Sequence, residues 1–181
     1  MSKIVIVGGV AGGATAAARL RRLDEKAEII VIERTGFVSY ANCGLPYYVG
    51  GVIKDDCDLT LQSPQSFFSR FNVDVRVSSE VTAIDREKKT VTVFSFDEGR
   101  EYVESYDTLI LSPGAKAMIP DTPGVHSERV LTLRTVEDAL KMRRLVEEEK
   151  PERAVVVGGG FIGLETAENL MEAGVKVTLL Q

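Results

Sequence analysis

Short runs of β-branched apolar residues, separated by glycine-rich or polar stretches, set the pattern at the start of the chain. Lys3–Val7 is such a run and predicts a strand buried on both faces of a parallel sheet. A glycine-rich turn follows at residues 8–13, and residues 14–23 predict a helix with Ala16, Leu20 and Leu23 on one apolar stripe. Residues 28–33 predict a second strand. This order of elements is typical of the first unit of a dinucleotide-binding fold.

Alternating strands dominate the middle of the chain. Four segments with period-two alternation are separated by polar turns, at residues 73–77, 81–85, 90–96 and 100–104. Together they predict a β-meander. A further buried strand is predicted at Thr108–Leu111.

The strand and glycine turn recur about 150 residues later. An amphipathic helix is predicted at residues 136–149, and a strand at 154–157 leads into Gly-Gly-Gly-Phe-Ile-Gly at 158–163. A helix at 164–173 and a strand at 175–180, expected to be buried on both faces, complete the second unit. The chain is therefore predicted to be α/β, with two units of the same kind around a meander.

The second turn fits the dinucleotide fingerprint G-x-G-x-x-G. Gly158 allows the tight turn, Gly160 lets the backbone approach a pyrophosphate, and Gly163 lets helix and strand pack closely. The helix N-terminus then offers free N–H groups to the phosphates. The alternative is a glycine-rich turn without a ligand.

The first turn departs from this fingerprint, because Val10 stands where the middle glycine belongs. Gly8 and Gly13 keep the outer spacing. Glu33 ends the second predicted strand, where a carboxylate accepts from ribose hydroxyls and favours FAD or NAD over NADP. The alternative for Glu33 is a surface acid. Gln181 takes the corresponding place in the second unit, which leaves the choice between NADH and NADPH open.

Composition narrows the class of protein. The chain has 181 residues, 44% of them hydrophobic, and a formal net charge of −5, which excludes a disordered chain and argues against a nucleic-acid binder. No apolar run reaches the ~18 residues of a membrane helix. Two scattered cysteines and one histidine form neither a disulfide scaffold nor a zinc site, so no metal is expected. The expectation is a soluble, cytoplasmic protein.

Cys43 is the candidate for covalent chemistry. It precedes a helix predicted at residues 45–49, and Pro46 suits the first turn of that helix. A thiol at a helix N-terminus is stabilised as the thiolate, the nucleophilic form. Cys57 lies in an acidic loop that disfavours a thiolate and is interpreted as a bystander. The alternative for Cys43 is a small buried apolar residue.

Three segments of the sequence resemble those of a known enzyme family. The segments Val-Gly-Gly-Val-Ala-Gly-Gly-Ala-Thr at 7–15, Ser-Tyr-Ala-Asn-Cys-Gly-Leu-Pro-Tyr at 39–47 and Tyr-Asp-Thr-Leu-Ile-Leu-Ser-Pro-Gly-Ala at 106–115 carry the resemblance. They resemble the coenzyme A-disulfide reductase and CoA-persulfide reductase branch of the pyridine nucleotide-disulfide oxidoreductases. The resemblance implies a Rossmann-like FAD-binding domain with a β-meander at 1–115. It also implies an incomplete Rossmann-like NAD(P)-binding unit at 116–181.

The resemblance assigns residues to three ligands, FAD, NAD(P)H and coenzyme A, and makes Cys43 the redox cysteine. The FAD set is Gly8, Gly9, Val10, Ala11, Gly12, Gly13, Glu33, Arg34, Asn42, Val81, Ser112 and Gly114. The nicotinamide set is Gly158, Gly160, Phe161, Ile162, Gly163 and Glu165. The CoA set is Thr15, Arg19, Arg22, Ser39, Asn42 and Arg70. Arg19 stands where the family commonly has Gln, and Phe71, beside Arg70, stands where it can have a basic residue.

Spacing gives separate support for a phosphate site. Thr15, Arg19 and Arg22 are spaced i, i+4 and i+7, so they share one stripe of the first predicted helix. Guanidinium groups bind phosphate bidentately, and CoA carries a pyrophosphate and a 3′-phosphate. The alternative is a solvated basic face near the helix C-terminus.

The implied activity is NAD(P)H- and FAD-dependent reduction of CoA disulfide or persulfide, through a mixed disulfide or by attack of Cys43 on a persulfide. Family members are more than twice as long and are homodimers, so this chain is expected to be an N-terminal fragment with little activity alone. One alternative is an NADH oxidase or peroxidase in which Cys43 cycles through sulfenic acid. Another is a non-catalytic nucleotide-binding remnant.

Overall fold

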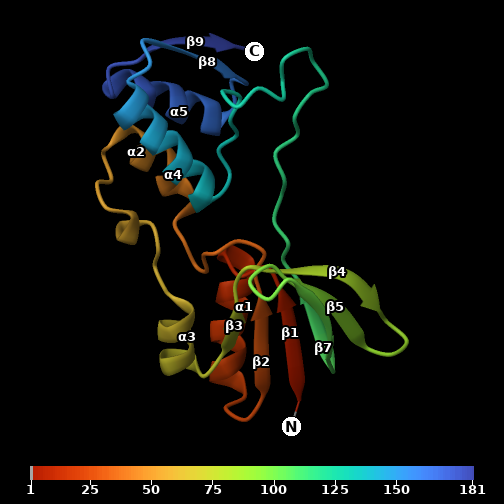
Figure 1. Ribbon diagram of the computed structural model, residues 1–181. Coiled ribbons are helices and arrows are strands. Elements are labelled where there is room, and N and C mark those ends of the chain that lie inside the picture. Colours follow the sequence, from red (N-terminus) through yellow and green to blue (C-terminus); the bar gives the residue numbers. More distant parts are fainter. Residues whose placement is uncertain (1) are drawn as a thin grey trace. The chain divides into compact units, whose positions relative to one another are not determined.

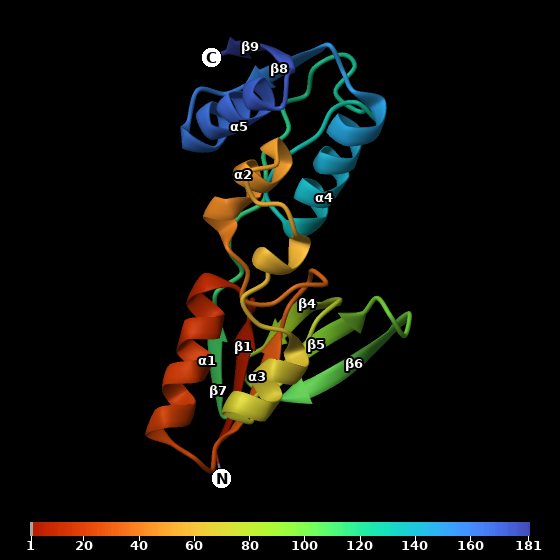
Figure 2. The same ribbon diagram turned by 90° about the vertical axis from the view of Figure 1, so that its left-hand side faces the viewer.

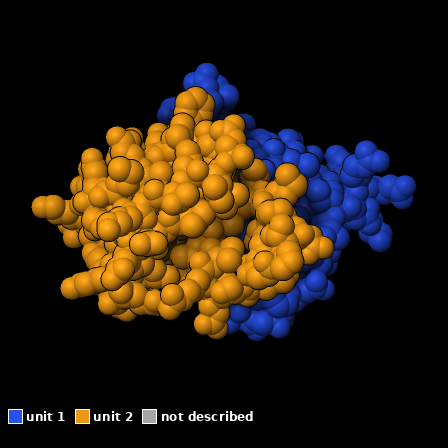
Figure 3. Space-filling view, turned by 90° about the horizontal axis from the view of Figure 1, so that it is seen from above, with its two compact units in different colours: residues 1–40, 60–114 blue, residues 41–59, 115–181 orange. Residues whose placement is uncertain are grey.

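The computed structural model describes residues 2–181, and their contacts divide the chain into two units (Figure 3). The first consists of Met1–Tyr40 and Thr60–Gly114, and the second of Ala41–Leu59 and Ala115–Gln181. The segment 41–59, which lies within the first predicted domain (1–115), therefore groups by its contacts with the second unit. The assignment of a cofactor to each domain stays a prediction.

A parallel sheet in the order β3-β2-β1-β7 forms the centre of the first unit (Figure 1). Its strands are β1 (Lys3–Val7), β2 (Glu28–Ile32), β3 (Asp74–Arg76) and β7 (Thr108–Leu111). In β1, Val5 lies opposite Ile30 of β2 and Leu109 of β7. The β-branched runs pair in register because both faces of this sheet are covered.

Helices α1 (Ala11–Leu23) and α3 (Pro64–Phe71) cover one face of that sheet (Figures 1 and 2). Gly13, Ala14 and Ala17 form the buried stripe of α1, whereas Leu23 is 66% exposed. Of the predicted stripe, Ala16 and Leu20 are partly buried against this core, whereas the prediction for Leu23 was wrong. The buried members of this core are Ile4, Ile6, Ala14, Ala17, Ala27, Ile29, Val31, Phe67 and Val73.

The antiparallel meander covers the other face. It consists of β4 (Ser79–Asp85), β5 (Thr90–Ser95) and β6 (Arg100–Ser105). Val91 and Val93 of β5 are fully buried against Val5, Ile30 and Ile32 of the parallel sheet.

The predicted meander contained one segment too many. The segment at 73–77 forms β3, which pairs with β2 in parallel and places Val75 opposite Val31. Hydrophobic alternation alone did not distinguish a parallel edge strand from a meander strand.

The second unit contains a two-stranded parallel sheet, β8 (Arg153–Val157) and β9 (Lys176–Leu180), with α5 (Phe161–Glu172) between them in sequence. Strand β9 was expected to be buried on both faces, but Leu180 is 52% exposed. Among residues 2–181, β9 has a single hydrogen-bonded neighbour strand, which explains the exposure.

Two further helices pack in the same unit. Helix α2 (Leu45–Gly50) contacts both α5 and α4 (Val136–Arg144), and α4 continues as a π-helical segment at Leu145–Glu149. A capping box closes the N-terminus of α4, because Thr135 Oγ1 accepts from the Asp138 N–H at 3.2 Å. No helix in the described part of the chain is long and apolar enough to cross a membrane.

Helices α1 and α5 both begin three residues earlier than predicted. The glycines at the end of each turn, Gly13 and Gly163, lie inside the first helical turn. Low helix propensity suggested that these glycines precede the helices, but close packing against the preceding strand overrides that propensity.

Candidate cofactor and substrate sites

The first glycine turn is built on close approach of backbones. Gly8 has φ +94°, donates its N–H to the Ile32 carbonyl at 2.8 Å, and lies so near the Ser112 carbonyl that a Cβ would overlap it. A Cβ at Gly13 would overlap the Gly8 carbonyl in the same way. The turn thus brings two residues of the predicted FAD set, Gly8 and Ser112, side by side.

Glu33 supports the same turn from the end of β2. Its buried carboxylate accepts from the Gly9 N–H at 2.7 Å, and from the Thr35 N–H and hydroxyl at 2.9 Å each. A carboxylate has about four acceptor positions, so one remains for a ribose hydroxyl. Thr35 was not predicted, although its place two residues after a strand-end acid is the signal for it.

The N-terminus of α1 completes an anion-binding arrangement. Its N-cap is Val10, which has no side-chain acceptor for the first N–H groups of the helix. Those groups and the partial positive charge of a 13-residue helix favour a phosphate. The turn, Glu33 and this helix end therefore fit a dinucleotide such as FAD.

Ser39 lies against the same turn in a left-handed conformation. It has φ +50° and donates its N–H to the Gly9 carbonyl at 2.9 Å. A non-glycine residue in this region costs about 1–2 kcal/mol, and such residues concentrate at functional sites. The role of Ser39 toward a ligand stays a prediction.

The other residues predicted in this unit are more dispersed. Arg34 is exposed and forms an ion pair of 3.4 Å with Glu80, while Val81 lies beside a bulge in β4. Gly114 has φ +70° after β7. The Arg70 guanidinium lies 5.4 Å from the centre of the Phe71 ring.

The arginines of α1 divide into two kinds. Arg21 donates to the carbonyls of Phe71 and Asn72 at 2.8 Å each, so it ties α1 to the end of α3. Thr15, Arg19 and Arg22, which the spacing places on one stripe, are all exposed. The side chains of Arg19 and Arg22 form no hydrogen bond or ion pair with another residue in the range 2–181. Their guanidinium groups are available to a phosphate.

The second glycine turn repeats the first. Gly158 has φ +111° and donates to the Leu180 carbonyl at 2.7 Å, and a Cβ at Gly163 would overlap the Gly158 carbonyl. A Cβ at Gly160 would meet no described atom within 4 Å, so the approach to α5 is open. The Gln181 side chain lies beside Gly159, as Glu33 lies beside Gly9. This turn also fits a dinucleotide.

The remaining nicotinamide candidates lie in the first turns of α5. Phe161 is 87% exposed and Ile162 is 52% exposed, so both side chains are accessible to a ligand. Glu165 is half-buried, and its carbonyl accepts from Asn169 Nδ2 at 2.8 Å.

Cys43 lies in a short 3₁₀ turn, Asn42–Gly44, that runs directly into α2. The predicted helix after the cysteine is confirmed, and the thiol is exposed rather than buried among apolar residues. Asn42, the residue before Cys43, has a buried Oδ1 with no hydrogen-bond partner among residues 2–181. Cys57 is also exposed, and neither cysteine forms a disulfide within the described chain.

A charged cluster fastens the meander to the parallel sheet. Glu104 of β6 binds Lys3 of β1 at 2.5 Å and Arg76 of β3 at 2.6 Å. Burial raises the pKa of Glu104, but the hydrogen bonds from Lys3 and Arg76 outweigh burial and hold that pKa below its usual value. The hydrogen bond to Glu104 is the largest cause of the raised pKa of Lys3. All three charges are paired, so the cluster has a structural role.

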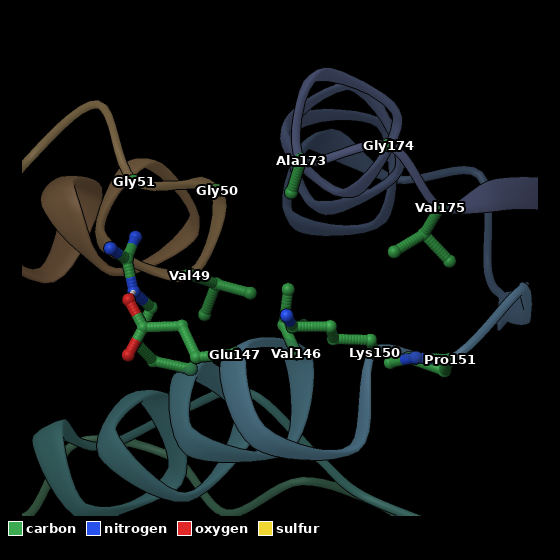
Figure 4. Close-up of a pocket in the computed structure, with 11 residues that line it drawn as sticks. Val49, Gly50, Gly51, Val146, Glu147, Lys150, Pro151, Ala173, Gly174 and Val175 are labelled. Atoms are coloured by element: carbon green, nitrogen blue, oxygen red, sulfur yellow. Dashed lines mark hydrogen bonds and ion pairs between the residues drawn. The ribbon is translucent and has the colours of Figure 1, made fainter.

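A cavity of about 430 Å³ lies within the second unit (Figure 4). Three valine side chains point into it (Figure 4). They are Val49 of α2, Val146 of the π-helical segment and Val175, which precedes β9. Its lining includes neither glycine turn. Among residues 2–181, no cluster of three or more His, Cys, Asp or Glu side chains has the arrangement of a metal site.

With this geometry established, the sequence matches the pattern of the pyridine nucleotide-disulphide oxidoreductases over residues 2–181. The chain belongs to this family. Among curated members, it is 46% identical to the coenzyme A disulfide reductase of Staphylococcus epidermidis over 98% of this chain and 40% of that protein. The chain thus spans about two fifths of this relative's length.

Solved structures of the family agree with the fold. Reduced Bacillus anthracis CoADR-RHD is 52% identical, with a TM-score of 0.96 over 98% of this chain and 32% of the other. An NAD-dependent persulfide reductase from A. fulgidus is 39% identical, with a TM-score of 0.92 over 98% of this chain and 33% of that protein. The α/β fold with its meander and the resemblance to CoA-disulfide and persulfide reductases are confirmed. The roles of individual site residues stay predictions.

Proposed function

We propose that the protein serves in a flavoprotein reductase that uses NAD(P)H and FAD to reduce CoA disulfide or CoA persulfide through Cys43. The observation that carries this proposal is the exposed thiol in the segment 39–47, on a chain 46% identical to a CoA disulfide reductase. The complete enzyme is proposed to be a homodimer. The described chain alone is proposed to bind FAD weakly and not to turn over.

The two glycine turns are proposed to hold the two dinucleotides. The first, with Glu33 and the N-terminus of α1, would hold the ribose and pyrophosphate of FAD. The second would hold NAD(P)H, with Phe161 and Glu165 near the nicotinamide. The flavin supplies transfer of an electron pair, while the protein positions the reacting sulfur.

Cys43 is proposed as the catalytic nucleophile. Its thiolate attacks one sulfur of CoA disulfide, the S–S bond breaks, and one CoA thiolate leaves as a Cys43–CoA mixed disulfide forms. Two electrons and one proton then return Cys43 to the thiolate and release the second CoA thiol. Arg19 and Arg22 would bind the CoA phosphates, because both guanidinium groups lack a partner within the described chain.

Intact-mass measurement tests the nucleophile. After incubation of the reduced protein with CoA disulfide, we expect one CoA-sized adduct that peptide analysis places on Cys43. Cys43→Ser removes the adduct, and Cys57→Ser, the matched control at the other exposed thiol, leaves it unchanged. Equal labelling of the two cysteines, or none, would contradict the proposal. Sulfenic acid at Cys43 with peroxide, and no reaction with CoA disulfide, would favour an oxidase or peroxidase instead.

A further inference from the structure

Helix α2 depends on its neighbours for its position. It has six residues and no side-chain N-cap, and an isolated helix of this length is marginal in water. Most of its residues are nevertheless buried: Val49 is fully buried, and Leu45 and Tyr48 are nearly so. The packing of α2 against α4 and α5 therefore holds the helix that directly follows Cys43.

Arg143 of α4 forms the most specific of these contacts. Its guanidinium donates to the Tyr48 carbonyl at 2.9 Å and lies 5.7 Å from the centre of the Tyr48 ring. A further N–H donates to Glu147, one turn along, which orients the side chain. A cation at the C-terminal end of a helix satisfies the last carbonyls and is favourable for the helix dipole.

Gly51 makes room for this guanidinium. It ends α2 with φ +87°, and a Cβ there would lie 2.6 Å from a terminal nitrogen of Arg143. Gly50 approaches α5 equally closely, since a Cβ there would lie 2.6 Å from Asn169 Cβ. The C-terminal end of α2 is thus held by α4 on one side and by α5 on the other.

The N-terminal end of α2 is continuous with the cysteine turn. The Leu45 N–H donates to the Asn42 carbonyl, and the Gly44 N–H donates to the Ala41 carbonyl at 2.9 Å. Motion of α2 therefore moves Cys43. We infer that Arg143 is a positioning residue for Cys43, because it fixes the helix that orients the thiol. This inference rests on the proposed function of Cys43.

The test compares arginines at adjacent positions of α4 in the full 181-residue chain. Arg143→Met removes the contact with Tyr48, and Arg143→Lys keeps the charge without the paired N–H groups. Arg144→Met is the matched control, because the Arg144 side chain is exposed and has no hydrogen bond or ion pair within residues 2–181. Iodoacetamide alkylation of Cys43, followed by peptide mass spectrometry, gives a rate, and Cys57 in the same sample gives the reference rate.

We expect Arg143→Met to lower the ratio of the Cys43 rate to the Cys57 rate about threefold, and Arg143→Lys to lower it less. Arg144→Met leaves the ratio unchanged. A thermal melt of each variant accompanies the rates, which are measured well below the melting temperature. A merely structural role for Arg143 would lower the melting temperature and leave the ratio unchanged, and that result would overturn the inference.

The outcomes also distinguish failure of the positioning role of Arg143 from failure of the proposed role of Cys43 as nucleophile. If Cys43 in the parent chain reacts no faster than Cys57, the proposed nucleophile fails and the inference fails with it. If Cys43 reacts faster in the parent and the ratio survives both Arg143 substitutions, the inference alone fails.

Discussion

The Glu33 carboxylate accepts a 2.7 Å hydrogen bond from the Gly9 N–H, so the end of β2 is tied to the first glycine turn. The side chain is 6% exposed, and Thr35 satisfies its other oxygen. One interaction thus ties the turn to β2 and orients the carboxylate that we propose as the acceptor for a ribose. In the second unit the Gln181 side chain lies beside Gly159, so a neutral amide stands next to that glycine where the first unit has a charged carboxylate.

Substitution of Glu33 is expected to weaken FAD binding. Glu33→Gln presents an NH₂ group where an acceptor is needed, for either the Gly9 N–H or Thr35. We expect at least about a tenfold increase in the FAD dissociation constant, corresponding to 1.4 kcal/mol or more. Quenching of flavin fluorescence measures it. Glu87→Gln, on an exposed turn, is the control. Equal FAD affinity in the parent and Glu33→Gln would contradict this role.

Gly8→Ala is expected to cost more stability than Gly99→Ala. Both glycines have positive φ, so both substitutions carry about 1–2 kcal/mol of backbone strain. Only Gly8 has a backbone carbonyl, that of Ser112, in the space a Cβ would take, while Gly99 has no described atom within 4 Å. Urea unfolding compares the two variants. Equal losses would show that the contact with Ser112 has no energetic consequence.

Glu104 is expected to make stability depend on pH. Its folded-state pKa is lowered, so its contribution is present above the unfolded pKa and is lost as pH falls through the folded pKa. At pH 7 we expect Glu104→Gln to lower the free energy of unfolding by about 1.5–3 kcal/mol. The difference from the parent narrows below pH about 4.3, the usual Glu value.

Urea unfolding at several pH values measures this dependence. Glu98→Gln is the control, because its ion pair with Arg100 is exposed and an exposed pair contributes about 0–1 kcal/mol. A difference between the parent and Glu104→Gln that stays constant from pH 7 to pH 3 would contradict the assignment.

The arginines of α1 are expected to separate binding from stability. Replacing Arg19 and Arg22 with Gln should slow adduct formation with CoA disulfide about tenfold and leave the reaction with pantethine, which has no phosphates, nearly unchanged. Arg21→Gln should instead lower the free energy of unfolding by about 1–3 kcal/mol, because the carbonyls of Phe71 and Asn72 lose their donor. Equal slowing with both disulfides would argue against a phosphate site.

Local patterns were sufficient for much of the fold. Strands β1 and β7 have the predicted ends, and both glycine turns lie between a strand and a helix as expected. These features depend on interactions within a few residues, such as the φ of Gly8 and Gly158. The segment 73–77 was misassigned because its partner, β2, lies some 40 residues away in sequence. Alternation does not specify a partner strand.

The residues of the candidate sites also divide into those that local spacing predicts and those that only tertiary contacts identify. Helical spacing predicts that Thr15, Arg19 and Arg22 share one stripe of α1. It does not predict the structural role of Arg21, because its acceptors lie about 50 residues away. Arg143 was not predicted either, since its acceptor on α2 is 95 residues distant and no motif marks it.

The sequence by itself determined the family, the two glycine turns and the cysteine segment, because these depend on residue type at short spacing. Tertiary structure decided which face of α1 is buried, where β3 pairs, and which arginines hold neighbouring elements in place. Those outcomes depend on contacts between segments far apart in the chain, where packing and hydrogen-bond geometry select among residues that look equivalent in sequence.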